Sequence, residues 1–596
     1  MITLGLNAAF HDSSAALVVD GVVVAAAEEE RFTRIKHGKR PVPFSAWELP
    51  FNAIDFCLQQ AGVTLADVDH VAYSYDPKTF LGERHAPTIT LPLEPSAADH
   101  GDWESPWDPL FAAYIVNAPR QLADGWPHHL RKRLSGVKAT SAPYRWHFVN
   151  HHTCHQASAF LAAPYPRCAV MTLDGRGEHA TTTYGRHRDS RYEPMGEVLM
   201  PHSLGMLYEQ MTTHLGFLHS SDEYKVMALA ALGTPRFARR LRDAIHIGAD
   251  GQYTIDPIDL TAIAGPAREP GSQMAEAHLD LAASLQDVLE SVVIELCAWL
   301  REASGERYLA MAGGVALNCV MNARLRDSGI FDGIWVQPAA GDAGTGLGAA
   351  LWVDARERRG LAPTDAKEQA VNTFAPRRWQ MDHPYLGPAY GDDEIEQLLK
   401  WAKLPYRRCE DLAAETAELL AANRIVGWFQ GRMEFGPRSL GARSILASPI
   451  DPAMQARLNE LKDREDFRPV APAVPEEELG NWFRPAEANG GQSPFMLFIY
   501  DLAPGAAERI PSACHTDRTA RVQTVNRDTN PRFHALLKAF GKKTGVPVLV
   551  NTSFNVRGEP IVCSPKAAIE AFFSTPLDAL SIGSFLVEKP SLQPST

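Results

Sequence analysis

The densest group of side chains that could carry out chemistry is a histidine cluster at residues 150–155, which read NHHTCH. On a helix, His151 and His155 are four residues apart and share one face, a spacing that allows two imidazoles to bind one metal ion. An octahedral iron or manganese ion also needs oxygen ligands, which Asp174 and Asp342 could supply from their loops. The alternative is a polar helix start whose histidines bind no metal.

A second group, near the N-terminus, combines His11 and Asp12 with Lys36 and His37. His11 lies in the turn after the first predicted strand, where such folds place groups that face a reacting phosphoryl or acyl centre. Lys36 ends the charged run at residues 28–36, so a solvated charged edge is the alternative.

Basic residues are concentrated in the second half of an otherwise acidic chain. The sequence has 58 Lys and Arg against 71 Asp and Glu, a formal net charge of -13. This local concentration favours a pocket for phosphate or carboxylate groups over a general basic surface. Ser553 follows a predicted buried strand and adds a hydroxyl donor at a strand end, where α/β proteins usually form their sites. The basic residues are Arg438, Arg443, Lys462, Arg464, Arg468 and Arg521.

The elements that must position these residues alternate between strands and helices. Three strands are expected between residues 2 and 27, the last two joined by Asp20-Gly21, a pair that favours a tight turn. A strand–loop–strand pattern recurs at 169–184, which suggests a duplicated α/β fold. Two unrelated hairpins are the alternative.

Two glycine-rich loops lie between a strand and a helix in the same half. One contains Gly313-Gly314 and leads to Asn318, and the other spans 341–348 and contains Asp342. A strand followed by a glycine-rich loop and a helix N-terminus presents backbone N–H groups to phosphate. Two such loops close together indicate nucleotide binding.

We divide the chain into a first domain at 1–365, a Pro-containing linker at 366–392 and a second α/β domain at 393–596. Residues 76–146 form either an ordinary surface subdomain or a lid over an acceptor. In the second domain, strands are expected at 425–430, 495–500, 519–525, 546–551 and 579–582.

The composition excludes several classes of protein. With 45% hydrophobic and 22% charged residues, the chain is typical of a globular protein and not of a disordered or fibrous one. The negative net charge argues against general nucleic-acid binding, and the apolar runs are too short to span a membrane. The eight scattered cysteines and the lack of a basic, apolar leader predict a cytoplasmic enzyme with reduced thiols.

Taken together, these motifs resemble the NodU-type O-carbamoyltransferases, and the resemblance runs along nearly the whole chain. In the first half it rests on FHDSSA at 10–15, EEERFTRIKH at 28–37, the histidine cluster and the loop at 341–348. In the second half it rests on FGPRSLGARS at 435–444, KDREDFRP at 462–469 and NTSFN at 551–555.

The resemblance implies both a fold and a reaction. The first domain would have a duplicated actin/hexokinase-like fold, similar to that of the universal tRNA threonylcarbamoyl transferase, and the second a YrdC-like α/β fold. In that family the second domain joins carbamoyl phosphate to ATP, which gives carbamoyl adenylate and pyrophosphate. The first domain then transfers the carbamoyl group to a hydroxyl of a small-molecule acceptor and releases AMP.

The resemblance also implies roles for particular residues. Fe²⁺ or another divalent ion would be held at the metal site, and ATP would act with Mg²⁺. The implied metal ligands are His151, His155, Asp174 and Asp342, and the implied catalytic residues are His11 and Lys36. The implied nucleotide contacts are Asp12, Gly313, Gly314, Asn318 and Asp342. The implied carbamoyl-phosphate contacts are Lys462, Arg468, Arg521 and Ser553, with Arg438 and Arg443 beside them.

Two other functions are weighed against this one. A tRNA threonylcarbamoyl transferase-like enzyme is disfavoured by the net charge of -13, and a non-catalytic, sugar-kinase-like protein by the full set of candidate ligands and cations. We therefore expect carbamoyl phosphate, ATP and a hydroxylated acceptor as partners, with no nucleic acid and no membrane. The sequence leaves open the identity of the acceptor and whether the chain forms a homo-oligomer.

Overall fold

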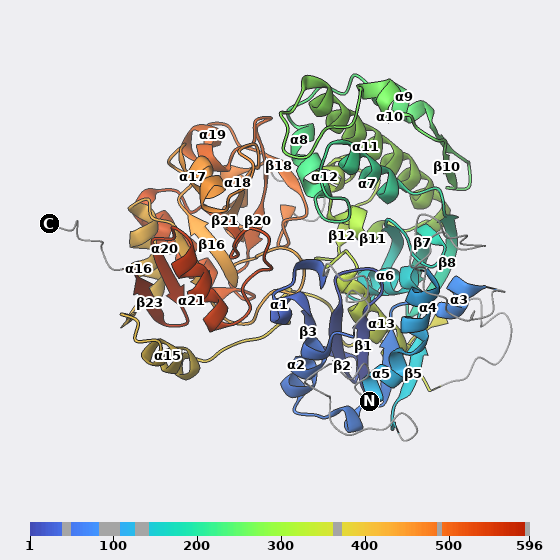
Figure 1. Ribbon diagram of the computed structural model, residues 1–596, viewed down its shortest axis with the longest axis horizontal. Helices are drawn as coiled ribbons and strands as arrows, with labels where there is room; N and C mark the ends of the chain where they lie inside the picture. Colours follow the sequence, from blue (N-terminus) through green and yellow to red (C-terminus); the bar gives the residue numbers. More distant parts are fainter. Residues whose placement is uncertain (39–48, 83–107, 125–141, 361–371, 485–490, 590–596) are drawn as a thin grey trace.

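The computed structural model describes residues 1–38, 49–82, 108–124, 142–360, 372–484 and 491–589 (Figure 1). Three large sheets organise these residues. Two belong to the first half of the chain, and the third belongs to the second half, which lies beside them in Figure 1. Helices cover the sheets, so most strand residues are buried.

The first sheet has the strand order β3-β2-β1-β4-β5. Its first three strands form an antiparallel meander, whereas β4 and β5 are added parallel to β1. The tight turn predicted at Asp20-Gly21 joins β2 to β3, and Gly21 has a φ of 87° there. The strands are β1 (Ile2–Asn7), β2 (Ser14–Val19), β3 (Val22–Glu28), β4 (His70–Tyr73) and β5 (Arg145–Phe148).

The second sheet repeats this arrangement in the order β12-β11-β6-β7-β8-β13. Strands β6, β7 and β8 form an antiparallel meander, and β11 and β12 are added parallel to β6. The same order and directions in both sheets confirm the duplicated actin/hexokinase-like α/β fold and exclude two unrelated hairpins. The strands are β6 (Arg167–Leu173), β7 (Ala180–Arg188), β8 (Arg191–Leu199), β11 (Tyr308–Ala312), β12 (Gly333–Val336) and β13 (Asn372–Thr373).

Two helices, α6 (His151–Phe160) and α13 (Ala343–Glu357), pack against each other between the two sheets. Their close approach depends on glycine. A Cβ at Gly348 would lie 1.8 Å from the carbonyl oxygen of Cys154, and one at Gly5 of β1 would lie 2.0 Å from that of Gly346. The N-termini of both helices therefore reach the region where the two halves meet. The longest helix of the first half, α11 (Glu276–Ser304), packs on α8 (Glu223–Ala230) and α12 (Cys319–Asp327).

The second domain is built on a mixed sheet with the order β14-β23-β22-β15-β16-β21-β17-β20, which confirms the expected α/β class. Its covering helices include α16 (Leu412–Ala421), α17 (Met454–Leu461), α20 (Pro531–Thr544) and α21 (Pro565–Ser574). The strands are β14 (Arg407–Arg408), β15 (Val426–Phe429), β16 (Arg443–Ala447), β17 (Ala471–Pro475), β20 (Gln523–Val525), β21 (Leu549–Ser553), β22 (Ala579–Ile582) and β23 (Phe585–Glu588).

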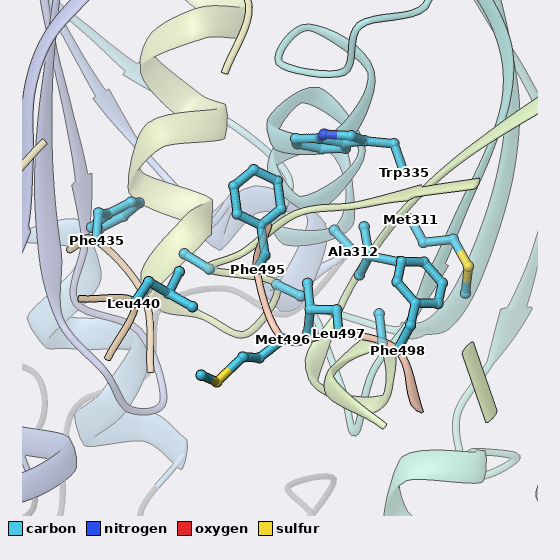
Figure 2. Close-up of a cluster of buried hydrophobic side chains, with 14 of the residues drawn as sticks. Met311, Ala312, Trp335, Phe435, Leu440, Phe495, Met496, Leu497 and Phe498 are labelled. Carbon is cyan, nitrogen blue, oxygen red and sulfur yellow. The ribbon is translucent and has the colours of Figure 1, made fainter. Parts of the chain in front are cut away.

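The strand predicted at 495–500 is largely wrong. Only β18 (Ile499–Asp501) forms there, paired with β19 (Thr519–Arg521). The preceding apolar residues instead pack against the first domain, where Phe495 lies beside Trp335 and Phe498 near Met311 (Figure 2). The run is apolar because it fills a contact between domains, which periodicity cannot distinguish from a buried strand.

Parts of the predicted linker contact both halves of the chain. Strand β13 pairs with β8 of the first domain. The Gly387 N–H donates to the Met433 carbonyl oxygen of the second domain, and the Met433 N–H donates to the Pro388 carbonyl oxygen. Within 76–146, helices α3 (Pro77–Leu81), α4 (Asp108–Val116) and α5 (Ala118–Asp124) are described. Residues 83–107 and 125–141, which include Trp103, Trp107 and Trp126, lie outside the described residues. Among the helices that the structure describes, none is long and apolar enough to cross a bilayer.

A buried ion pair in the charged segment after β3 joins the two domains. The Arg31 guanidinium donates to Glu28 Oε1 (2.9 Å) and to the Gly436 carbonyl oxygen (2.8 Å), and Gly436 N–H donates to Glu28 Oε1 (2.9 Å). Both side chains are buried. Arg34 extends the contact to the Ile561 carbonyl oxygen. The segment predicted as a possible solvated edge is therefore the interface between the domains.

We expect Arg31→Met to lower the free energy of unfolding by about 3–5 kcal/mol, because it leaves the Glu28 carboxylate buried without its partner. Urea unfolding followed by tryptophan fluorescence measures the change. Arg557→Met is the matched control, since it breaks an exposed ion pair with Asp463 that is worth at most about 1 kcal/mol. Equal effects of the two substitutions would contradict the importance of the buried contact.

Candidate functional site

The four predicted metal ligands come together at the place where the two halves of the first domain meet. His151 and His155 lie on α6, Asp174 follows β6, and Asp342 precedes α13. The two Nε2 atoms are 3.2 Å apart. Asp174 Oδ2 lies 3.4 Å from each of them, and Asp342 Oδ1 lies 3.5 and 3.7 Å from them. All four residues are buried, and their ligand atoms lie within 4.8 Å of one another.

Neighbouring groups hold these side chains in place. Asn150 caps α6 by accepting a hydrogen bond from the Thr153 N–H. The Glu178 carboxylate accepts hydrogen bonds from the His151 N–H and from Asn150 Nδ2. Gly314 N–H donates to Asp174 Oδ1 (2.8 Å), which leaves Asp174 Oδ2 to face the histidines. The sequence analysis did not assign Glu178 to this site, although it belongs to the same Asp-Gly-x-Gly-Glu run as Asp174.

The electrostatics of this cluster suit a cation. Burial alone would lower the pKa of His151, but the two carboxylates raise it well above its ordinary value. Burial would raise the pKa of Asp342, but His11 and His151 lower it to about 2. Two buried carboxylates that face two imidazoles need protons or a divalent cation to offset their charge. Two nitrogen and two oxygen donors fit Fe²⁺ and similar divalent ions.

His11 borders this cluster. Its Nε2 lies 3.8 Å from Asp342 Oδ2, and its Nδ1 lies 3.0 Å from Asp12 Oδ2. Asp12 also bonds His37 through its other oxygen (2.8 Å). Both carboxylate oxygens of Asp12 are thus engaged by imidazoles, and its contact with a nucleotide stays a prediction.

The glycine-rich loop after β11 has two kinds of role. Gly313 has a φ of 95°, and a Cβ there would lie 2.1 Å from the Leu173 carbonyl oxygen, so only glycine allows this approach. Asn318 caps α12 by accepting from the Met321 N–H, and its amide exchanges hydrogen bonds with Gln286. The Asn318 side chain thus caps α12 and bonds Gln286 within the protein, and its nucleotide contact stays a prediction.

The predicted anion-binding residues of the second domain gather at a second cluster. Lys462 Nζ donates to Ser553 Oγ (2.8 Å) and to Asn555 Oδ1 (2.7 Å). Burial and the nearby Arg464 and Arg468 hold the pKa of Lys462 well below its ordinary value. Such repulsion between buried cations is relieved when an anion binds.

Three arginines of this cluster have buried donors without a hydrogen-bond partner among the described residues. These atoms are Nε of Arg438, Nε of Arg521 and Nη2 of Arg464. Burial and Arg521 lower the pKa of Arg438 to about 9. Arg464 was not among the residues assigned by the resemblance, although it lies two positions after Lys462 in the same basic run.

Arg443 does not belong to this cluster. Its guanidinium donates to the carbonyl oxygens of Gln430, Ala442 and Pro388, and it lies 3.7 Å over the Phe429 ring. These bonds give Arg443 a structural role in the second domain, and its contact with carbamoyl phosphate stays a prediction.

The cationic cluster faces the first domain. The Arg468 guanidinium lies 4.6 Å over the Tyr224 ring, and Lys225 Nζ pairs with Glu465 Oε1 at 2.9 Å. Lys36 is close enough to Lys462 to contribute to its lowered pKa. Residues of both domains therefore contact each other beside the cationic cluster.

Comparison with known proteins assigns both halves of the chain to one family. Residues 2–351 match the family model described as carbamoyltransferase N-terminus, and residues 417–589 match the one described as carbamoyltransferase C-terminus.

Three relatives match along nearly the full chain. An uncharacterized protein of Synechocystis is 37% identical, covering 98% of this chain and 96% of the relative. Nodulation protein NolNO of Sinorhizobium fredii is 36% identical, and the match covers 99% of this chain and 80% of the relative. Nodulation protein U of Rhizobium fredii is 36% identical, and the match covers 94% of this chain and 91% of the relative.

We expect the purified protein to hold one divalent ion at the four-residue cluster. His155→Ala should remove the ion, because it deletes one of the two imidazole ligands. Elemental analysis of the folded protein measures the content. His152→Asn is the matched control, since His152 follows His151 on the same helix but bonds Thr172 Oγ1 instead (2.8 Å). Wild-type metal content in His155→Ala would contradict the assignment.

Proposed function

Because the chain belongs to the carbamoyltransferase family, we propose that it is an ATP-dependent O-carbamoyltransferase acting on a hydroxyl of a small-molecule acceptor. The observation that carries this proposal is the cluster of buried cations at the face between the domains, in which one donor each of Arg438, Arg464 and Arg521 lacks a hydrogen-bond partner among the described residues. Such a cluster suits two polyanionic substrates, carbamoyl phosphate and ATP.

In the proposed first step, the second domain makes carbamoyl adenylate. Lys462 and Ser553 would hold carbamoyl phosphate, with Arg468 and Arg521 offsetting the repulsion between its phosphate and those of ATP. Water would split carbamoyl phosphate into carbamate and inorganic phosphate, and pyrophosphate would leave the α-phosphorus of ATP. The carbamate oxygen then forms the new bond to the α-phosphorus.

In the proposed second step, the first domain transfers the carbamoyl group. His11 Nδ1 bonds the Asp12 carboxylate, which orients the ring, and Nε2, on the side of Asp342, would take the proton of the acceptor hydroxyl. The hydroxyl oxygen attacks the carbamoyl carbon, and AMP leaves with the bonding electrons. A divalent ion held by His151, His155, Asp174 and Asp342 would supply Lewis-acid stabilisation of oxygen charge.

The two steps would share an enclosed space. Carbamoyl adenylate hydrolyses in water, so a route between the domains protects it. Support comes from Arg468, which lies over Tyr224 of the first domain, and from the Lys225–Glu465 ion pair beside it. A tRNA threonylcarbamoyl transferase-like function is the alternative, and the net charge of -13 argues against it.

Lys462→Ala and Arg468→Ala should each lower carbamoyl-phosphate-dependent exchange of pyrophosphate into ATP by about 10- to 100-fold at sub-saturating carbamoyl phosphate, because each removes a charge-assisted contact. Arg518→Ala, which breaks an exposed ion pair with Glu508, should leave exchange unchanged. Wild-type exchange in either test variant would contradict the anion assignment.

His155→Ala should behave in the opposite way. It should keep pyrophosphate exchange, which we assign to the second domain, and lose transfer to an acceptor alcohol. Loss of both half-reactions in a folded His155→Ala protein would contradict this division of labour.

A mixture of these variants tests whether the intermediate stays enclosed. At sub-saturating carbamoyl phosphate, Lys462→Ala should make little adenylate, and His155→Ala should not transfer from it. If the intermediate is retained within one molecule, the mixture should produce no more carbamoylated acceptor than the two variants produce separately. Mass spectrometry of the acceptor measures the product, and a mixture that restores transfer would contradict an enclosed route.

A further inference from the structure

The basic loop of the second domain, residues 462–469, is held from both domains. Its backbone is fixed within the second domain, because Asn459 Nδ2 donates to the carbonyl oxygens of Asp466 (3.0 Å) and Arg468 (3.1 Å). The Arg468 side chain extends the other way, and its guanidinium carbon lies 4.6 Å from the centre of the Tyr224 ring. The position of this guanidinium therefore depends on a residue of the first domain.

The first domain presents Tyr224 and the adjacent Lys225 from the first turn of α8. This helix lies on the side of the first half that faces the second domain (Figure 1). Val226 and Leu229 are buried, and the helix packs on α11. Because its other residues are anchored in the core, α8 offers Tyr224 and Lys225 as fixed points for the basic loop.

Lys225 determines which partner the Glu465 carboxylate takes. Lys225 Nζ lies 2.9 Å from Glu465 Oε1 and 3.2 Å from Asp222 Oδ2. Glu465 Oε2 lies 3.7 Å from Arg468 Nη1, which is beyond the length of a hydrogen bond. Glu465 is three positions before Arg468 in the same loop, so it could otherwise pair with the guanidinium directly. The lysine thus keeps this carboxylate from neutralising the arginine.

The contacts of Arg468 leave its donors for an anion. Within the described residues, the long contact with Glu465 is the only ion pair of its guanidinium. The face of the Tyr224 ring attracts the cation but takes none of its N–H groups as a conventional acceptor would. A guanidinium held over a ring therefore keeps its planar edge of donors for a phosphate, which it can bind through two hydrogen bonds.

Docking of the two domains is the competing interpretation of these contacts. The domains are already joined through Glu28, Arg31 and Gly436, where every group has its partner in the other domain. The contacts of α8 differ, because both fall on the loop that carries Lys462 and one of them is made to Arg468, a candidate anion ligand. Docking alone gives no reason for the ring to lie over that arginine.

We propose that Tyr224 and Lys225 of the first domain are positioning residues for adenylate formation in the second domain. Tyr224 would hold the Arg468 guanidinium against its ring face, and Lys225 would hold the Glu465 carboxylate away from it. Both residues act through Arg468 and neither needs to touch the substrate. The inference rests on the proposed function, in which Arg468 binds carbamoyl phosphate, and it makes the first domain necessary for the half-reaction of the second.

Pyrophosphate exchange of the full-length protein, measured over a range of carbamoyl phosphate concentrations, tests the role of the ring. Tyr224→Leu should raise the KM for carbamoyl phosphate about 5- to 20-fold and change kcat by less than about twofold, because it weakens binding without removing a reacting group. Tyr224→Phe keeps the ring and should keep the wild-type KM. An unchanged KM in Tyr224→Leu, or equal increases in both variants, would overturn the role of the ring.

A double-mutant cycle separates positioning from docking. In the Arg468→Ala background the ring has nothing left to position, so adding Tyr224→Leu should change the KM by less than about twofold. A docking contact would instead have the same effect in both backgrounds. Equal increases of KM with and without Arg468 would therefore overturn the proposal.

Lys225 is tested through its partner. Lys225→Met should raise the KM for carbamoyl phosphate about 5- to 20-fold, because the released Glu465 carboxylate can then pair with Arg468. Adding Glu465→Gln should restore a KM near that of the wild type, because the amide carries no charge. Lys400→Met is the matched control, since it breaks an exposed ion pair of the same 2.9 Å length with Glu396. A wild-type KM in Lys225→Met, or no recovery in the double variant, would overturn the role of Lys225.

The results also distinguish this inference from the proposed function. Absence of exchange in the wild-type protein would overturn the proposed function, and with it the inference that rests on it. Normal wild-type exchange, together with an unchanged KM in both Tyr224→Leu and Lys225→Met, would overturn the positioning role alone.

Discussion

Burial of charge that the chain itself does not neutralise is the constraint on which the rest of the structure depends. In the first domain, Asp174 and Asp342 face two imidazoles at distances of 3.4–3.7 Å. In the second, Arg438 and Arg521 have buried donors without partners among the described residues. Such buried groups lose their hydration, and their charge is offset in the free protein only by bound protons or not at all. Each would become favourable with a bound ligand of opposite charge, an exchange of stability for affinity at both places.

The fold supplies the rigidity that this exchange requires. The helices that carry the histidines and follow Asp342 approach so closely that a Cβ at Gly348 would meet the backbone of Cys154. The two domains are joined by a buried ion pair in which Glu28 and Arg31 both contact Gly436. Loss of one partner of a buried ion pair strongly destabilises a protein. This pair therefore favours one relative position of the two domains. The cations of the second domain therefore stay opposite the loop of the first.

Two short segments of the first domain serve several purposes at once. The loop after β1 carries His11 and Asp12, and the segment after β3 carries Arg31, Lys36 and His37. Asp12 bonds both histidines, so one carboxylate orients a ring that borders the metal cluster and a ring that bonds Ser221. The segment that joins the domains is thus also the one that completes the candidate chemistry, which couples domain packing to the geometry of the site.

The sequence by itself determined the features that depend on local spacing. The four-residue separation of His151 and His155 places both on one helix face, and the repeated strand–loop–strand pattern indicated the duplicated fold. Only the tertiary structure decided the roles of side chains whose partners are distant in the chain. Asp12 and Arg443 both look like ligand contacts from their residue types, yet one bonds two histidines and the other bonds backbone carbonyl oxygens. The partners of a charged side chain come from segments that are distant in the sequence. Helical and strand periodicity depend on neighbouring residues only, so they cannot predict these long-range contacts.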